Sequence, residues 1–474
     1  MRLFITAPTA NEGMRGFREM IALYALAPVS SLITKCSMHS RPLFACTLLL
    51  LFGTVARVAP IRMEDKGAAP RGEARGTIRQ TEHSSLARHS ELARVRSATV
   101  RMEIRDDRIF VPLRVVGPRG KSVVARFWVD SGGDIVVLSG LLAHELGLQP
   151  SGPVSVGMGQ TPLQAVTKPQ ISIAGMGIDL TDVNVLASSS ETSRDAFAGV
   201  DAEGFLPATV LKRYEVVFDY PARSFTLAQP GSITHRGTPV DIGVQPKTGF
   251  ARVRVTVGRQ TYGFMLDTGA AYTCVSRTLM DGWTAEHPFW PHSAGAVGAA
   301  NMVGKEFDAS NELLRIPEVR WGPFLLKDVG MVSRPAGVFE EAVSADMTEP
   351  IVGTLAGNVL RHFRIDLDYP AGIAYLESGR MLGDVDLDCV GLIVQVKGDG
   401  TVLVSGVSRK NGRPEITGVQ AGDTLLRVDH HDVTGASLAA IHEYLSGTVG
   451  DQKRLTVRRG KQTFSISAVV TRHP

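Results

Sequence analysis

Residues 204–227, GFLPATVLKRYEVVFDYPARSFTL, align without a gap on residues 353–376, GTLAGNVLRHFRIDLDYPAGIAYL. Both copies begin with glycine, and both contain an Asp-Tyr-Pro trio, at 219–221 and at 368–370. Two copies of one segment indicate a duplicated structural unit. The chain is therefore expected to contain two similar halves.

A second shared feature precedes each copy: an apolar strand that ends in an acid. The stretches are ARFWVDSGGDIVVLS, 125–139, and GFMLDTGAAYTCVS, 263–276. A carboxylate among apolar neighbours is costly unless it is hydrogen-bonded or takes part in chemistry. Glycine two residues later permits a sharp turn with close backbone approach. The two motifs are Asp130-Ser131-Gly132 and Asp267-Thr268-Gly269.

The duplication predicts a mainly β fold with two lobes, 98–233 and 234–385, related by a pseudo-twofold axis. A twofold axis places equivalent residues of the two lobes opposite each other, so Asp130 and Asp267 are expected to meet at the axis. Two adjacent carboxylates cannot both ionise cheaply, so they share a proton and titrate as a pair. One would take a proton from a water held between them while the other donates to the carbonyl oxygen of a peptide bond.

The two Asp-Ser/Thr-Gly motifs, each followed by a GxLxxxVL segment led by Gly204 or Gly353, resemble a family. They look like the two lobes of a retropepsin-like (acid protease) aspartyl protease in one chain, of the bacterial type with a C-terminal PDZ domain. The resemblance covers nearly everything after residue 98. It implies an aspartic endopeptidase that acts on peptide or protein substrates, without a cofactor or metal, with Asp130 and Asp267 as the catalytic pair.

The same resemblance assigns supporting roles. The segments led by Gly204 and Gly353 would pass behind the aspartate loops, with Gly132 and Gly269 in the loops themselves. The hydroxyls of Ser131 and Thr268 would bond across the lobe interface. In the family a glycine-rich hairpin between the motifs acts as a flap. The flap candidates are VSVGMGQTPLQAV, 154–166, with Gly157 and Gly159, and SAGAVGAANMVG, 293–304, with Gly295 and Gly298.

Some residues depart from the family pattern. Alanine or serine usually follows the motif, so Ala270 fits, whereas Gly133 followed by Asp134 does not. Asp134 would add a negative charge near the first aspartate if it faces inward. Pro207 and Ala356 stand where the family has glycine. These departures keep an alternative open, a non-catalytic peptide-binding protein with degenerate protease lobes.

Residues 386–474 predict a small α+β domain. Two strands flank the turn at 398–400, and 437–447 has helical spacing of apolar residues. The stretch VQAGD, 419–423, resembles the turn of bacterial PDZ domains, which bind an extended peptide as an added strand. The resemblance implies C-terminal peptide tails as partners. The alternative is a groove filled by this protein's own chain. The expected carboxylate-binding loop is Gly391, Leu392 and Ile393.

The N-terminus is expected to lie outside the fold. Residues 38–56, MHSRPLFACTLLLLFGTVA, have a short basic start, an apolar core and small residues at plausible cleavage positions, which is typical of a secretory signal. Residues 1–37 are then an uncertain leader, with a possible true start at Met38, and 57–97 a disordered linker or pro-segment. We expect a periplasmic or secreted protein, or one anchored in the membrane through 43–56 if the signal is not cleaved.

Composition excludes other classes. The 474 residues carry 51 basic and 47 acidic side chains, a net charge of only +4, and we expect no nucleic-acid partner. His144 and Glu145 have no second histidine at metal-binding spacing, so they are expected on a solvated helix face. Cys274 and Cys389, the two cysteines left after signal cleavage, are expected to be buried and free. Because one chain supplies two lobes, a monomer with intramolecular lobe pairing is expected.

Overall fold

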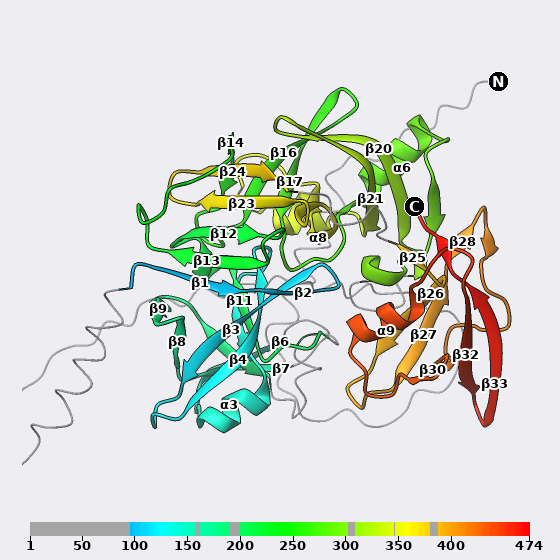
Figure 1. The fold of residues 1–474 in the computed structure, drawn as a ribbon, viewed down its shortest axis with the longest axis horizontal. Coiled ribbons are helices and arrows are strands. Elements are labelled where there is room, and N and C mark those ends of the chain that lie inside the picture. The colour runs from blue at the N-terminus through cyan, green and yellow to red at the C-terminus, as the bar shows by residue number, and fades with distance from the viewer. Residues whose placement is uncertain are drawn as a thin grey trace, which may run out of the picture. The chain divides into compact units, whose positions relative to one another are not determined.

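The computed structural model describes residues 95–156, 162–188, 197, 200–301, 309–345, 347–379 and 387–474, and strands dominate this part of the chain (Figure 1). The protein is mainly β, as predicted. In these ranges no helix is both long and apolar enough to cross a membrane. The expected leader 1–37, the signal 38–56, nearly all of the linker 57–97, and Gly157 and Gly159 lie outside the described residues.

The first sheet occupies the N-terminal half, in the order β6-β7-β10-β5-β11-β4-β3-β8-β9, with β2 paired to β3. Its core strand β3 buries most of its residues. The strands are β2 (Glu103–Arg105), β3 (Arg108–Val116), β4 (Ser122–Asp130), β5 (Val136–Leu138), β6 (Pro150–Val156), β7 (Pro162–Val166), β8 (Gln170–Ile173), β9 (Met176–Ile178), β10 (Val185–Ser188) and β11 (Gly204–Pro207).

The second sheet follows, in the order β15-β16-β17-β22-β18-β21-β20-β19-β28-β29. Strand β16 buries every other residue, which is the period of a strand with one face on the core. The strands are β15 (Gly243–Val244), β16 (Ala251–Val257), β17 (Gln260–Leu266), β18 (Cys274–Ser276), β19 (His292–Ala294), β20 (Glu312–Trp321), β21 (Phe324–Arg334), β22 (Gly353–Leu355), β28 (Arg409–Lys410) and β29 (Arg413–Pro414).

The two sheets repeat one pairing pattern around the acidic motifs. In the first sheet β11 runs parallel to β4 and antiparallel to β5, which is itself parallel to β10. In the second sheet β22 runs parallel to β17 and antiparallel to β18, which is parallel to β21. The duplicated sequence therefore forms a duplicated strand arrangement, with each glycine-led segment beside the strand that leads to its aspartate.

Glycine begins both segments because the neighbouring strand is too close for a side chain. A Cβ at Gly204 would lie 2.4 Å from the Phe127 ring, and a Cβ at Gly353 would lie 2.4 Å from the carbonyl oxygen of Cys274. Real Cβ atoms do not approach other atoms this closely. The tight strand pairing therefore requires glycine at both positions.

The helices also follow the duplication. Ser139 and Ser276, each nine residues after its aspartate, begin helices α3 and α6, and their side chains accept hydrogen bonds from Leu142 N and Leu279 N. His144 and Glu145 lie on the exposed face of α3, as predicted. The helical segments are α3 (Gly140–Leu146), α5 (Ala208–Leu211), α6 (Arg277–Glu286), η2 (Gly298–Ala300), η3 (Val338–Val343), α8 (Gly357–Leu360) and α9 (Leu438–Leu445).

A six-stranded sheet, here the shared sheet, joins the two halves in the order β1-β13-β12-β23-β24-β14 (Figure 1). At its centre β12 pairs antiparallel with β23, so that Glu215 lies opposite Asp368, Val217 opposite Asp366, and Asp219 opposite Arg364. The strands are β1 (Ser97–Arg101), β12 (Glu215–Asp219), β13 (Ser224–Ala228), β14 (Thr238–Asp241), β23 (Phe363–Asp368) and β24 (Ile373–Ser378).

The register of β12 and β23 has twofold symmetry. In the sequence repeat 215 corresponds to 364, and 219 to 368. Residue 215 pairs with the counterpart of 219, and 219 pairs with the counterpart of 215. This reciprocal pairing is what an isologous contact across a twofold axis requires. The axis therefore passes between Val217 and Asp366.

The C-terminal residues form an α+β domain from a sheet in the order β26-β27-β30-β32-β33 and helix α9. Leu438, Ile441 and Leu445 of α9 are buried in its core, as their helical spacing predicted. The strands are β25 (Asp388–Cys389), β26 (Leu392–Val396), β27 (Val402–Val407), β30 (Thr424–Val428), β31 (His431–Asp432), β32 (Gln452–Arg459), β33 (Gln462–Val469) and β34 (Thr471–Arg472).

Buried apolar clusters hold the described parts of the chain together. The largest contains side chains from the first, second and shared sheets, and another fills the C-terminal domain. A third joins the second sheet to the C-terminal domain, where Met265 and Leu313 share a cluster with Leu387 and Ile393. Cys274 and Cys389 are both buried and free, as predicted.

Candidate active site

Asp130 and Asp267 lie side by side in the structure. Asp130 ends β4, Asp267 directly follows β17, and their exposures are 6% and 8%. Each opposes the glycine of the other motif: a Cβ at Gly269 would lie 2.1 Å from Asp130 Cγ, and a Cβ at Gly132 would lie 2.8 Å from Asp267 Cγ. Any larger residue would displace the opposite carboxyl group. The two motifs therefore fit only against each other.

Two hydroxyl side chains lock the motifs together. The Ser131 hydroxyl donates to the Leu266 carbonyl at 2.7 Å and accepts from the Thr268 amide at 3.0 Å. The Thr268 hydroxyl donates to the Val129 carbonyl at 3.0 Å and accepts from the Ser131 amide at 3.0 Å. All four bonds are buried, where hydrogen bonds rigidify a polar network that is fully satisfied. They fix the two carboxyl groups relative to each other.

Backbone amides orient the two carboxyl groups unequally. Asp130 Oδ1 accepts from the Gly132 amide at 2.7 Å. Asp267 Oδ1 accepts from both the Gly269 and the Ala270 amides at 3.0 Å. Because amide donors favour the ionised form of a carboxyl group, this difference favours the negative charge on Asp267.

The pKa of each acid follows from burial and from its partner. Burial raises the pKa of Asp130 well above its ordinary value, and the charge of Asp267 raises it further. Burial also raises the pKa of Asp267, but the hydrogen bond from Asp130 and the backbone amides oppose that rise. Both the backbone donors and these pKa directions therefore favour the proton on Asp130 and the negative charge on Asp267.

Asp134 adds a third acid beside the pair. Its charge contributes to the raised pKa of Asp130, and burial raises its own pKa to about 6. The preceding glycine is confined as well, since a Cβ at Gly133 would lie 2.4 Å from the Phe205 ring. The departure from the family pattern at 133–134 therefore changes the electrostatics of the first motif and leaves Asp130 in position.

A buried cation near the pair was not identified from the sequence. Arg108 on β3 is 2% exposed and donates through Nε to the Gly269 carbonyl at 3.2 Å. Its charge lowers the pKa of Asp267. Arg108 Nη1 also pairs with Asp106 at 2.7 Å, and Asp106 contacts His442 Nδ1 of α9 at 3.0 Å. This chain of contacts connects the C-terminal domain to the second motif.

Two tyrosines near the pair were also missed. Burial raises the pKa of both Tyr220 and Tyr369, and the charges of Asp267 and Asp130, respectively, raise it further. Both hydroxyls are buried without a hydrogen-bond partner among the described residues. They are the central residues of the two Asp-Tyr-Pro trios, so the sequence repeat was the signal that could have identified them.

The described residues of the second flap candidate, 293–301, are mostly buried. Gly295 and Gly298 are buried under the C-terminal domain, where a Cβ at Gly295 would lie 2.8 Å from Ile393 Cδ1 and one at Gly298 would lie 3.3 Å from Cys389 Sγ. Residues 302–304 of the predicted hairpin lie outside the described residues. The described part of this segment, 293–301, packs against the C-terminal domain, and a flap role for Gly295 and Gly298 stays a prediction.

The expected carboxylate-binding loop has most of its polar groups in use. The Leu392 amide donates to the Val390 carbonyl at 2.6 Å, and the Gly391 carbonyl accepts from the Ser408 amide at 2.9 Å. Leu392 and Ile393 are buried. At the edge of β26, Asn301 Nδ2 donates to the Val394 carbonyl at 2.8 Å. The chain's own segment therefore occupies part of this strand edge, in line with the alternative of a self-filled groove.

The arrangement can perform acid–base chemistry. A protonated carboxyl group beside an ionised one can donate to a carbonyl oxygen while its partner accepts a proton from water. Side chains of the kind that bind metals gather elsewhere, on the shared sheet, at Glu215, His235 and Asp368.

Comparisons with known proteins add little. No family model and no curated protein matches the chain. Among solved structures, the photosystem II D1 C-terminal processing protease matches at 25% sequence identity with a TM-score of 0.17, covering 18% of this chain and 24% of that chain. A TM-score this low carries no argument about fold or function.

Proposed function

We propose that this chain is an aspartic endopeptidase with two retropepsin-like lobes. The observation that carries the proposal is the reciprocal fit of the two motifs, in which each glycine faces the other aspartate and the hydroxyls of Ser131 and Thr268 tie the loops together. Burial makes both carboxyl groups costly, so stability alone does not explain why an acid stands at either position. Chemistry at the pair accounts for their presence.

In the proposed reaction a water bound between the acids attacks the carbonyl carbon of a peptide bond. Asp267 accepts a proton from that water, and Asp130 donates its proton to the carbonyl oxygen. The tetrahedral product then collapses, with a proton delivered to the leaving amine and the shared proton restored to the pair. Activity requires one proton on the pair, so the rate should fall at low pH, where both acids are protonated, and at high pH, where both are ionised.

The direct test is cleavage of an unfolded protein by the purified chain from pH 3 to 8. A bell-shaped profile, inhibition by a statine-type mimic of the tetrahedral intermediate, and loss of cleavage in Asp130→Asn would support the proposal. Equal cleavage by the parent and by Asp130→Asn would refute it. N-terminal sequencing of the mature protein tests the proposed export, for which cleavage near Ala56 is expected.

We propose that the C-terminal domain is a PDZ-like module. The order of its strands and the presence of helix α9 support this proposal. A peptide tail could add to β26 only after Asn301 gives up its bond to the Val394 carbonyl. Asn301→Ala should therefore strengthen binding of a fluorescent peptide library with free C-termini. Unchanged binding would show that this edge does not receive peptides.

A further inference from the structure

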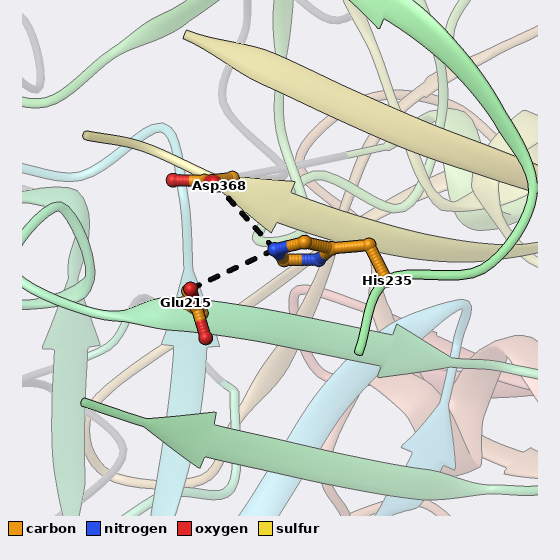
Figure 2. A group of neighbouring side chains, drawn as sticks. All are labelled: Glu215, His235 and Asp368. Atoms are coloured by element: carbon orange, nitrogen blue, oxygen red, sulfur yellow. Dashed lines mark ion pairs between the residues drawn. The ribbon is translucent and has the colours of Figure 1, made fainter. Parts of the chain in front are cut away.

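A histidine and two carboxylates from three separate segments meet on the shared sheet. Figure 2 shows His235 between Glu215 on β12 and Asp368 on β23. His235 Nε2 lies 3.7 Å from Glu215 Oε1 and 3.5 Å from Asp368 Oδ2. One ligand atom from each residue lies within 4.8 Å of the others. The group is far along the chain from either Asp-Ser/Thr-Gly motif and plays no part in the proposed proteolysis.

The contacts of the imidazole are incomplete. Both Nε2 distances exceed the 2.7–3.2 Å of a normal N–H···O hydrogen bond. Nδ1 is buried and makes no hydrogen bond among the described residues, and it faces Asp366 Oδ2 only at 3.9 Å. The side chain is nevertheless just 14% exposed. The imidazole is thus largely enclosed by carboxylates, and neither of its nitrogens makes a hydrogen bond among the described residues. A cation held by all three side chains would satisfy these groups.

The separations fit a metal ion better than a hydrogen bond. Zinc lies about 2.0–2.2 Å from histidine nitrogen and carboxylate oxygen, so neighbouring ligands of a tetrahedral site are about 3.3–3.5 Å apart. The two distances from His235 Nε2, 3.5 and 3.7 Å, are close to that range. The three ligand atoms lie within 4.8 Å of one another, so the two carboxylates would move inward to complete the polyhedron, with water as a further ligand on the solvent side, where Asp368 is 18% exposed.

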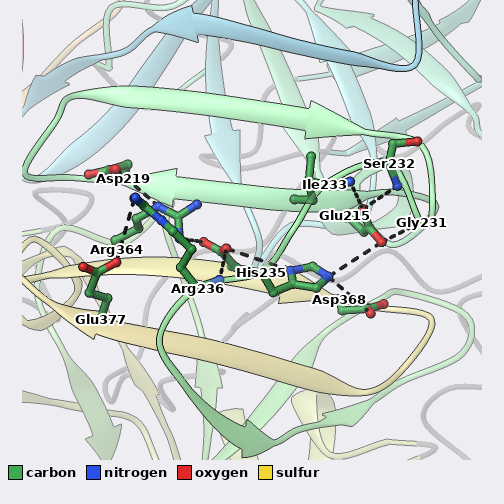
Figure 3. Close-up of polar contacts among 11 residues, drawn as sticks. Glu215, Asp219, Gly231, Ser232, Ile233, His235, Arg236, Arg364, Asp368 and Glu377 are labelled. Carbon is green, nitrogen blue, oxygen red and sulfur yellow. Dashed lines mark hydrogen bonds and ion pairs between the residues drawn. The ribbon is translucent and has the colours of Figure 1, made fainter.

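Each ligand is already oriented by its surroundings. Figure 3 shows Glu215 held by the backbone amides of Gly231, Ser232 and Ile233, at 2.6, 3.2 and 3.2 Å. Asp368 Oδ1 accepts from the Ala371 amide at 3.0 Å, which leaves Oδ2 toward His235.

The imidazole is held in the same way. It stacks on Tyr375 with ring centres 4.5 Å apart and planes at 2°. Asp366 Oδ2 lies 3.9 Å from Nδ1, on the side of the ring where metal-binding histidines usually meet an outer carboxylate. Preorganised ligands of this kind favour binding because little side-chain order is lost.

We propose that Glu215, His235 and Asp368 bind a divalent transition-metal ion. The mixture of nitrogen and oxygen ligands favours Zn²⁺. Glu215 and Asp368 are register partners in the β12–β23 pair that joins the two lobes. His235 lies in the connection between β13 and β14. The ion therefore clamps β12, this connection and β23 at one point.

Isothermal titration of the full chain with zinc chloride, after removal of metal with EDTA, tests the site. The parent should bind one equivalent more than His235→Ala, and Asp368→Asn, which keeps the side-chain shape, should weaken that equivalent at least tenfold. His144→Ala, an exposed histidine beside Glu145, is the matched control and should bind like the parent. Cobalt in place of zinc should give the visible absorption of a tetrahedral site in the parent and lose it in His235→Ala.

Two results would overturn the proposal. Equal zinc stoichiometry in the parent and in His235→Ala, or in the parent and in Asp368→Asn if the alanine variant does not fold, would show that these three residues do not bind the ion. If saturating zinc does not change the melting temperature of the parent, the ion does not clamp these segments together. Neither result depends on peptide cleavage, so failure here is separate from failure of the proposed protease activity.

Discussion

The loops that carry Asp130 and Asp267 have nearly the same backbone and different electrostatics. Asp130 has one amide donor and an acidic neighbour, Asp134. Asp267 has two amide donors and the buried guanidinium of Arg108. In the sequence repeat the counterpart of Asp134 is the buried Ala271. Every difference moves the proton to Asp130 and the charge to Asp267.

This comparison separates two kinds of information in a duplicated chain. The residues that recur, the glycines and hydroxyls, set the geometry that both halves share. The residues that differ, Asp134 and Arg108, break the electrostatic symmetry of the pair. In a symmetric pair the two acids differ only by which one carries the proton. Here the surrounding residues already make the two acids different.

Removing either carboxyl group should have the largest effect. We expect Asp130→Asn and Asp267→Asn each to lose at least about 10³-fold in kcat, because one acid cannot both donate and accept the proton. The double variant should lose little more, as for residues that act as a unit. Steady-state cleavage by the purified variants measures this. Retained activity in Asp130→Asn alone would make the first lobe a degenerate partner.

The same variants test the cost of burying Asp130. Its folded pKa is raised, so the parent loses stability as pH rises from the unfolded value near 3.8 through the folded value. Asp130→Asn removes this loss. Melting curves should show the variant more stable than the parent at pH 7 and equal to it below about pH 3.5. A variant that is less stable at pH 7 would contradict the raised pKa.

Alanine at the two motif glycines should show which loop is packed more tightly. Gly269→Ala places a methyl group 2.1 Å from Asp130 Cγ, whereas Gly132→Ala places one 2.8 Å from Asp267 Cγ. Overpacking of this kind costs about 1–3 kcal/mol. Both variants should lose activity, with Gly269→Ala at the upper end of this range in urea unfolding. Gly177→Ala on β9, where no atom lies within 4 Å of the added methyl group and φ is not positive, is the control and should cost little.

Replacing Arg108 should change the acid limb of the pH profile. Arg108→Met removes a positive charge that lowers the pKa of Asp267, so Asp267 becomes protonated at higher pH. The low-pH limb should move upward by about one unit, in line with the effect of a neighbouring opposite charge. Arg105→Met on the exposed face of β2 is the control and should leave the limb unchanged. If the low-pH limb does not move in Arg108→Met, Arg108 does not influence the acid pair.

Replacing Asp134 by its counterpart in the second motif should have the smallest effect. Asp134→Ala removes a charge that raises the pKa of Asp130, so Asp130 loses its proton at lower pH. The high-pH limb should move downward by less than about one unit while the low-pH limb stays. Asp182→Asn, at an exposed turn, is the control. Movement of the low-pH limb instead would assign the proton to the opposite acid.

The sequence was sufficient for the parts of the fold that repeat. The alignment of 204–227 on 353–376 predicted two similar β halves and brought Asp130 and Asp267 together, because duplicated segments follow the same local rules. Arg108 was not predicted, since a single basic residue in an apolar strand has no periodic signal. The burial of Gly295 and Gly298 was not predicted, because glycine content is compatible with a hairpin and with tight packing alike. The contact of Asn301 with β26 is set by domain packing, which local pattern does not encode.

The twofold register of β12 and β23 also determines which halves can associate. In a pair of second lobes that used the same register, each Asp366 would lie opposite another Asp366, and this carboxylate is fully buried. Like charges directly opposite each other in a sheet are destabilising, all the more without water. In the fused chain Asp366 faces Val217 instead. This single side chain thus disfavours a dimer of two second lobes in the same register, a penalty that the pairing of unlike lobes avoids.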